Sequence, residues 1–208
     1  MSRLTVGILG LQGDIEEHLS ATSLALSRLG VEGKPLLVKS IDDVKRINAL
    51  IIPGGESTVM GSLSSIKGIL PALRERISNG LPTLGTCAGM ITLAKRVRDR
   101  VVGETSQTLI GTMDITVERN SFGRQRESFE ADLELDMPGA GKFHGVFIRA
   151  PSVKSFGQGV KELARLGDAV VAVQQGNMIG TAFHPELSGS TILHEHLVRL
   201  AKADSVRA

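Results

Sequence analysis

The sequence LPTLGTCAGMITLA, residues 81–94, determines the fold that we expect for this chain. Its first half is a short apolar run of the kind that forms a buried parallel strand. From Ala88 to Arg98 the residues are good helix formers, so we expect a helix there. Between them lies Gly85-Thr86-Cys87-Ala88-Gly89, a G-x-C-x-G pattern. This is the cysteine version of the nucleophile elbow, a tight strand-to-helix turn at the top of an α/β sheet.

Cys87 has two interpretations on this stretch alone. A cysteine among apolar residues is commonly an inert part of the core. At an elbow, the following helix would point its free N–H groups at the sulfur and favour the reactive thiolate. The N–H of Ala88 would also be placed to bind a developing oxyanion. A base elsewhere in the chain is needed to decide between the two.

The composition is that of a globular chain. It has 208 residues, 41% of them hydrophobic and 22% charged, which fits one domain over 1–208 with 203–208 as a frayed tail. A net charge of +2 and the lack of Trp and Tyr give no reason to expect nucleic acid or a membrane as partner. The one cysteine excludes an internal disulfide, and no apolar run suits a signal peptide or a membrane span. We therefore expect a cytoplasmic protein.

Apolar runs that alternate with helical segments predict a doubly wound α/β fold with a mostly parallel sheet. Buried strands are expected at Leu4–Gly10, Val31–Lys39 and Ala49–Ile52. Alternating apolar and polar residues predict antiparallel edge strands at 109–118 and 128–135, and a hairpin at 169–183. Helices are expected at 15–29, 59–63, 70–79 and 191–202.

Two loops of this predicted sheet could meet a ligand. Pro53-Gly54-Gly55-Glu56-Ser57 follows a buried strand, and bare glycines there let backbone N–H groups approach a ligand. An ordinary strand-exit turn would look the same. The polar loop 117–126 carries Arg119, Arg124 and Arg126, which suit planar carboxylates or simply form a solvated charged loop.

The histidines near the two ends of the chain have no predicted role. His18 follows Asp14, which can cap the first helix, and we interpret His18 as a surface or capping residue. His194-Glu195-His196 could suggest a metal site, but residues i and i+2 of a helix point apart. We therefore interpret this segment as a solvated helix face and expect no metal.

His184-Pro185-Glu186 supplies the base that Cys87 requires. In an extended segment, residues i and i+2 project to the same side, and proline favours an extended chain. Glu186 could then accept a hydrogen bond from one imidazole nitrogen while the other faces the thiol. Both parts would lie at the carboxyl ends of strands, where open α/β sheets place their sites. An elbow cysteine with a distant H-x-E is a stronger signal than either motif alone.

These motifs together resemble the class I, or triad, glutamine amidotransferases, whose fold is flavodoxin-like. Within that class the chain is similar, from Val6 to about Leu187, to the PdxT family, the glutaminase subunits of pyridoxal 5′-phosphate synthase. The stretches that together carry this resemblance are LGLQG at 9–13, PGGEST at 53–58, VERNSFGRQ at 117–125, SFEA at 128–131 and VFIRAP at 146–151. Of these, the Arg119 loop and the run from Phe147 to Pro151 are family-specific, whereas the triad is shared by the whole class.

The resemblance implies a Cys87, His184 and Glu186 triad that hydrolyses glutamine through a γ-glutamyl thioester. Gly55 and Ala88 would supply the oxyanion-hole N–H groups. It also implies a set of residues that hold glutamine: Gly55, Glu56, Ser57, Arg119, Ile148 and Arg149. Ammonia would pass to a partner synthase subunit that makes pyridoxal 5′-phosphate from ribose 5-phosphate and glyceraldehyde 3-phosphate, in a large hetero-oligomer. No cofactor is expected on this chain.

Three other interpretations remain open. The chain could be the glutaminase of another synthase, such as imidazole glycerol phosphate synthase, although the Arg119 loop and the 147–151 run disfavour this. It could be a cysteine peptidase on the same fold, or a catalytically silent subunit. Segments 98–109 and 135–145 are longer than the resemblance requires and could alter the partner surface.

Overall fold

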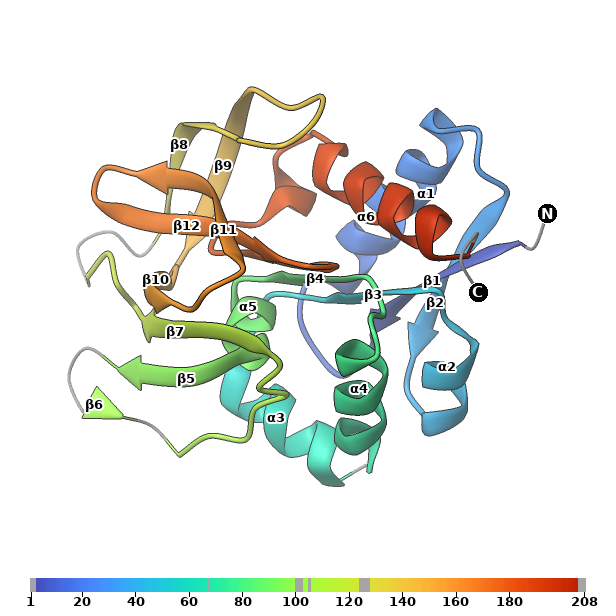
Figure 1. The fold of residues 1–208 in the computed structure, drawn as a ribbon, viewed down its shortest axis with the longest axis horizontal. Helices are drawn as coiled ribbons and strands as arrows, with labels where there is room; N and C mark the ends of the chain where they lie inside the picture. The colour runs from blue at the N-terminus through green and yellow to red at the C-terminus, as the bar shows by residue number, and fades with distance from the viewer. Residues whose placement is uncertain (1–2, 67, 100–102, 105, 124–127, 206–208) are drawn as a thin grey trace.

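The computed structural model describes residues 3–66, 68–99, 103–104, 106–123 and 128–205. The chain forms a large mixed sheet, and helices cover both faces of its parallel half (Figure 1). Arg124, Gln125 and Arg126 of the predicted loop, and 206–208 of the predicted tail, lie outside the described residues, as do 100–102 and 105 of the longer segment 98–109.

The parallel half of the sheet carries the order β2-β1-β3-β4-β13. Its strands are β1 (Leu4–Leu9), β2 (Gly33–Val38), β3 (Ala49–Ile52), β4 (Thr83–Thr86) and β13 (Met178–Thr181). β3 and β4 are buried throughout, as expected for parallel strands covered on both faces. This half confirms the doubly wound, mostly parallel α/β class.

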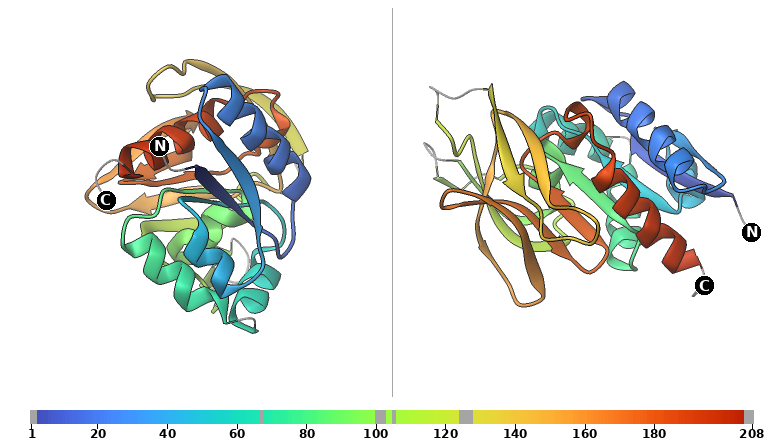
Figure 2. Two further views of the ribbon diagram at one scale, coloured as in Figure 1. Left: turned by 90° about the vertical axis from the view of Figure 1, so that its right-hand side faces the viewer. Right: turned by 90° about the horizontal axis from the view of Figure 1, so that it is seen from above.

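Helices cover both faces of this half. One face carries α1 (Ile15–Arg28) and α6 (Ile192–Ser205), which lie side by side, and the other carries α2 to α5 (Figures 1 and 2). The latter are α2 (Ile41–Arg46), α3 (Ser57–Ile66), α4 (Ile69–Ser78) and α5 (Ala88–Leu93). None of the helices in the described part of the chain is long and apolar enough to cross a membrane.

The other half of the sheet is largely antiparallel and continues as β12-β10-β7-β5-β6, with β11 paired to β12. Its strands are β5 (Ala94–Asp99), β6 (Gly103–Glu104), β7 (Met113–Arg119), β10 (Ser152–Phe156), β11 (Val160–Leu166) and β12 (Ala169–Gln175). β8 (Ser128–Glu134) and β9 (Lys142–Ile148) form a separate antiparallel pair.

Several predicted elements were wrong in this second half. The helix expected from Ala88 to Arg98 ends at Leu93, and Ala94 begins β5, which pairs in parallel with β7. The strand expected from Leu109 begins only at Met113. β10 and β11 were not predicted, because VKELARL in β11 has the composition of a helix.

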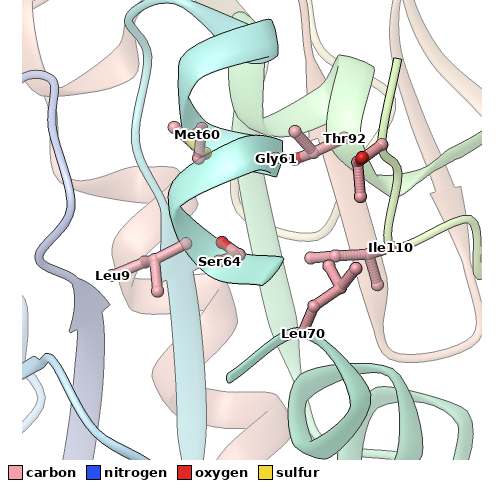
Figure 3. A pocket seen from close by; sticks show the side chains of 8 residues that line it. Leu9, Met60, Gly61, Ser64, Leu70, Thr92 and Ile110 are labelled. Carbon is pink, nitrogen blue, oxygen red and sulfur yellow. The ribbon is translucent and has the colours of Figure 1, made fainter. Parts of the chain in front are cut away.

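A small pocket beneath α3 shows how tightly the helical layer is packed. Leu9, Met60, Ser64 and Ile110 line it, and Figure 3 shows these side chains converging between α3, α4 and the chain before β7. The space does not admit a water molecule. It is therefore part of the core rather than a ligand site.

Candidate active site

Four strand-exit loops bring the site together at the carboxyl edge of the parallel half. The loop after β1 carries Asp14, the loop after β3 carries Gly55, the end of β4 carries Cys87, and the chain after β13 carries His184. Because neighbouring parallel strands end at one edge, residues far apart in sequence meet there. Cys87 and His184 lie on chain that follows directly paired strands, β4 and β13.

The turn at Cys87 has the strained geometry of an elbow. Its φ of 48° and ψ of −103° place a non-glycine residue at positive φ, outside the regions that L-residues favour. A Cβ on Gly89 would collide with the Ile52 carbonyl oxygen, and one on Gly85 would lie 2.7 Å from Leu93 Cδ1. Both glycines are thus needed for the close passage of the chain. The thiol is buried, 6% exposed, and Sγ lies 3.7 Å from the Ile148 carbonyl oxygen.

Glu186 contacts His184 as the sequence suggested, but by a different local structure. Oε1 lies 2.8 Å from His184 Nδ1, and the Glu186 side chain is fully buried. The expected extended segment was wrong: His184 is extended, whereas Pro185–Leu187 is a 3₁₀ turn with proline at its start. Proline fits the first position of a helical turn, because its missing N–H has no partner there in any case.

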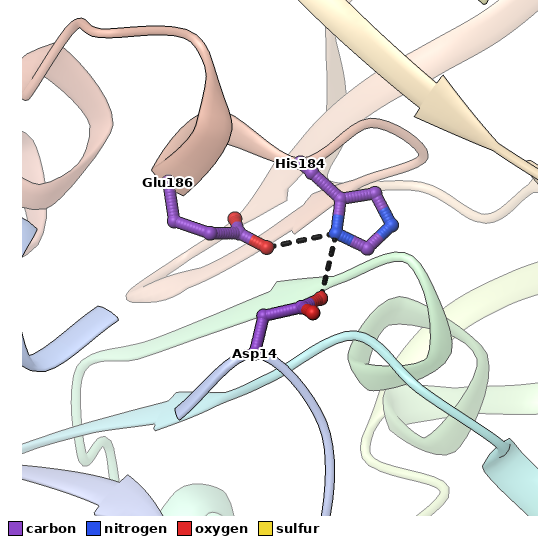
Figure 4. Close-up of side chains that lie close together, drawn as sticks. All are labelled: Asp14, His184 and Glu186. Carbon is purple, nitrogen blue, oxygen red and sulfur yellow. Dashed lines mark hydrogen bonds and ion pairs between the residues drawn. The ribbon is translucent and has the colours of Figure 1, made fainter. Parts of the chain in front are cut away.

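A second carboxylate reaches the same ring nitrogen. Asp14 Oδ2 lies 3.0 Å from His184 Nδ1, and Figure 4 shows Asp14 and Glu186 converging on that atom. Asp14 does stand at the N-cap of α1, but its side chain makes no capping hydrogen bond. No sequence pattern indicated this contact, because a helix-capping role already accounted for an aspartate at this position.

The two carboxylates and the cysteine set the charge of the imidazole. Burial disfavours the charged form of His184, but hydrogen bonds with Asp14, Cys87 and Glu186 outweigh it and raise its pKa to about 12. Since Nδ1 serves the carboxylates, Nε2 is the nitrogen left for the thiol; it is buried without a standard hydrogen bond within the described residues. With a pKa of about 12, His184 is a cation at neutral pH.

The pKa values of the two carboxyl groups, Asp14 and Glu186, are shifted in opposite directions. The hydrogen bond with His184 lowers the pKa of Asp14, which is partly exposed. Burial raises the pKa of Glu186, and the hydrogen bond with His184 opposes that rise. Ligand atoms of Asp14, His184 and Glu186 all lie within 4.8 Å of one another, close enough to suggest a metal. Both carboxylates approach one nitrogen, which must carry a proton to bind them, so hydrogen bonding accounts for the cluster.

The residues that the resemblance assigns to glutamine lie on three neighbouring segments. Gly55 has a φ of 132°, Glu56 follows it, and Ser57 begins α3. Arg119 ends β7, and its Nη2 lies 3.3 Å from Glu56 Oε1. Ile148 ends β9.

Arg149 directly follows Ile148, and Gln107 lies between Ser57 and Arg119. Arg149 is exposed, with a left-handed φ of 44°. Gln107, which sequence reasoning did not single out, joins two of the assigned residues: its Oε1 lies 3.4 Å from Ser57 Oγ and 3.3 Å from Arg119 Nη1.

The loops after β1 and β3 are joined above the sheet. Gln12 Nε2 donates to the Glu56 carbonyl oxygen at 2.5 Å. A Cβ on Gly54 would collide with the His184 ring, and one on Gly13 would collide with the Gly54 carbonyl oxygen. Both glycines therefore let the two loops and the imidazole pack at backbone distance.

Two further histidines lie beneath the site, and both predictions for them were wrong. His18 is 0% exposed rather than a surface or capping residue, and His194 is 1% exposed rather than part of a solvated face. They contact each other, with His18 Nδ1 3.0 Å from His194 Nε2. His196 is half-buried and lies 3.2 Å from Gln174 Oε1 instead.

Comparison with known proteins agrees with this geometry. Residues 8–202 match the profile of the SNO glutamine amidotransferase family. The chain belongs to that family. The resemblance inferred from the sequence is thereby confirmed.

Individual relatives are similar along nearly their whole length. The chain is 50% identical over 200 residues to "Pyridoxal 5'-phosphate synthase subunit PdxT" of Sulfurisphaera tokodaii, covering 96% of this chain and 100% of that protein. It is 51% identical over 206 residues to the protein of the same name from Pyrobaculum neutrophilum, with the same coverage. A solved structure titled "Crystal structure of glutamine amidotransferase" is 47% identical, covers 95% of this chain and 98% of its own, and superposes with a TM-score of 0.82.

Proposed function

We propose that this chain is a glutaminase that hydrolyses L-glutamine to L-glutamate and ammonia and delivers the ammonia to a pyridoxal 5′-phosphate synthase subunit. The observation that carries the proposal is the His184 imidazole, held on Nδ1 by Glu186 at 2.8 Å and facing the elbow cysteine in a glutamine amidotransferase family member. PdxT is also the name printed for the full-length relatives.

Cys87, His184 and Glu186 act as nucleophile, acid–base group and orienting carboxylate. The Cys87 thiolate attacks the glutamine side-chain carbonyl carbon, and the resulting oxyanion is bound by the N–H groups of Gly55 and Ala88. The cationic His184 then gives its Nε2 proton to the departing nitrogen, which leaves as ammonia. A γ-glutamyl thioester remains on the sulfur.

Hydrolysis of the thioester reverses the roles. His184, now neutral, takes a proton from water, and the hydroxide attacks the thioester carbonyl. The tetrahedral intermediate collapses, releases glutamate and restores the Cys87 thiolate beside the His184 cation. Glu186 stays ionised and hydrogen-bonded to Nδ1 in both halves of the cycle.

The backbone groups of glutamine are recognised by a pair of opposite charges. Arg119 suits the planar α-carboxylate, and Glu56, 3.3 Å away, suits the α-ammonium. Ser57, Ile148 and Arg149 complete the set taken from the resemblance. Recognition of a free carboxylate distinguishes glutamine from a glutaminyl residue within a peptide, which lacks that group.

The partner synthase uses the ammonia with ribose 5-phosphate and glyceraldehyde 3-phosphate to make pyridoxal 5′-phosphate. We propose that the whole chain acts as one glutaminase domain within a large hetero-oligomer, without a bound cofactor. Its cytoplasmic location stays a prediction. Segments 98–109 and 135–145 remain candidates for the partner surface.

The test is release of glutamate and ammonia from glutamine, with and without the synthase subunit, beside Cys87→Ala and Cys87→Ser. We expect hydrolysis that the synthase subunit stimulates and that both variants lose. Equal release of both products by Cys87→Ala would contradict the proposed nucleophile. Absence of hydrolysis by the wild-type complex would contradict the proposed function.

A further inference from the structure

The far oxygen of the Glu186 carboxylate lies against a buried histidine. Oε1 binds His184, whereas Oε2 has no standard hydrogen bond within the described part of the chain. His18 Nε2 lies 3.3 Å from Oε2, and both side chains are 0% exposed. A buried carboxylate oxygen without a donor is costly, so the proton on His18 matters for the charge of Glu186.

The proton positions on the two buried histidines follow from their neighbours. An ionised Glu186 oxygen can only accept, so His18 Nε2 must carry the proton that faces it. A neutral His18 then accepts at Nδ1, and His194 Nε2, 3.0 Å away, must donate. His194 Nδ1 is left as a bare acceptor, which fits its lack of a partner among the described residues.

Both rings are held neutral by their surroundings. Burial lowers the pKa of His194 to about 4. Burial lowers the pKa of His18 well below its usual range, and repulsion from His194 and His184, whenever those rings are charged, lowers it further. Because each neutral ring carries one N–H, the hydrogen bonds run in one direction: His194 donates to His18, and His18 donates to Glu186.

His18 also touches the strand that carries the nucleophile. Its Nε2 lies 3.2 Å from Thr86 Oγ1, and Thr86, fully buried, directly precedes Cys87. One N–H therefore faces both the carboxylate behind His184 and the end of β4. His18 comes from α1 and His194 from α6, helices that pack side by side on this face of the sheet (Figure 2).

We propose that His18 is a positioning residue for the glutaminase reaction: its Nε2–H, oriented by His194, holds Glu186 in the ionised state that faces His184. This inference rests on the proposed function. His18 does not touch the reacting atoms. It acts on the carboxylate that supports the His184 cation, and loss of its N–H leaves a buried oxygen that binds a proton instead.

The test compares variants that keep or remove the donor, assayed with the synthase subunit present. Gln places an amide N–H near the position of His18 Nε2, whereas Leu fills the space without a donor. We expect His18→Leu to lower kcat by about 10- to 100-fold with little change in KM, since a misplaced or protonated carboxylate weakens acid–base catalysis. His18→Gln should recover most of the loss.

The pH profile separates this role from simple packing. With His18→Leu the acidic limb of kcat should move to higher pH, because Glu186 binds its proton more readily. The titratable groups around that carboxylate are His184, Asp14, His18 and His194, with Cys87 beyond the ring. His194→Leu should give a smaller shift in the same direction. His196→Gln, on the same helix but outside this cluster, serves as the matched control and should behave as wild type.

The outcomes are distinct. An inactive wild-type complex overturns the proposed function itself. An active wild type with a folded His18→Leu that keeps the wild-type kcat and pH profile overturns only the role of His18. Equal losses in His18→Leu and His18→Gln, with an unmoved acidic limb, also overturn it, because packing alone would explain them.

Discussion

Histidines on the two sides of Glu186 have opposite charge states. On the outer side, His184 contacts two carboxylates and a cysteine, and its pKa is raised to about 12. On the inner side, His18 and His194 contact each other in a fully buried layer, and burial lowers the pKa of both. The same type of side chain is therefore a cation in the outer layer and neutral in the inner layer.

The difference shows that distance from solvent does not by itself set the charge of a histidine. His184 is only 3% exposed, yet its carboxylate neighbours outweigh desolvation. His18 also lies near a carboxylate, at 3.3 Å, but burial lowers its pKa and repulsion from charged His194 or His184 adds to that effect. The balance between burial and the contacts of each ring therefore decides its charge.

Replacing His184, the outer histidine, should lower the glutaminase kcat more than any of the other changes. His184→Asn removes the group that we propose protonates the departing nitrogen and deprotonates water. We expect the glutaminase kcat to fall by about 10³-fold or more, as for other triads. Glutamate release in the presence of the synthase subunit measures this. A folded variant within tenfold of wild type would contradict the role of His184.

Removing the charge of Glu186, which lies between His184 and His18, should cause the second-largest loss of kcat. Glu186→Gln keeps the shape but removes the charge that supports the His184 cation, and we expect a loss of about 100-fold or more in kcat. Glu195→Gln, which changes a glutamate on α6 that pairs with Arg28 and Arg199, is the matched control and should retain wild-type activity. If the two variants had equal activity, the triad role of Glu186 would be wrong.

Replacing Asp14 should have a smaller effect, a shift of the pH profile of kcat in one direction. Asp14→Asn removes one of the contacts that raise the pKa of His184, so that pKa should fall. The basic limb of the kcat profile, where the cation loses its proton, should move to lower pH. Glu16→Gln in the first turn of α1 controls for charge on the same helix. An unmoved limb in Asp14→Asn would show that Glu186 and Cys87 alone determine the protonation of His184.

His194 and His184 should make the free energy of unfolding depend on pH in opposite directions. A folded pKa of about 4 for His194, against about 6.5 unfolded, means that the unfolded chain binds the proton first. Stability is then lost as pH falls from about 6.5 towards 4, by up to roughly 3 kcal/mol. His184 has a raised pKa, so its contribution is full below about 6.5 and is lost as pH rises towards 12.

Denaturant unfolding across pH measures both slopes. His194→Gln should flatten the acidic slope and leave the basic one, whereas Asp14→Asn should flatten the basic slope. A wild-type stability that does not decline between pH 6.5 and 4, or an identical decline in His194→Gln, would show that His194 is not held neutral in the fold.

Cys87, His184 and Glu186 of the outer layer could be predicted from the sequence, whereas the Asp14 contact and the inner layer could not. Cys87 stands in a five-residue pattern, and His184 and Glu186 are two residues apart, so local spacing carries their signal. His18 and His194 lie 176 positions apart, and each has the local pattern of a surface histidine. Their contact depends on the packing of α1 against α6, which no local pattern specifies.

The fold also has one half that could be predicted from the sequence and one half that was harder to predict. Continuous apolar runs identified the parallel strands, because burial on both faces leaves a strong mark on composition. The antiparallel half was harder: Ala94 to Arg98 suits a helix, yet pairing with β7 makes it a strand. Tertiary pairing overrides propensity there, and β11 was missed for the same reason.

The most direct test of the two charge states is ¹⁵N NMR of the labelled imidazoles between pH 5 and 9, assigned with His18→Gln, His184→Asn and His194→Gln. We expect His184 to stay doubly protonated across this range, while His18 and His194 stay neutral with the proton on Nε2. A neutral His184 at pH 7, or a His18 that becomes cationic as pH falls to 6, would contradict it.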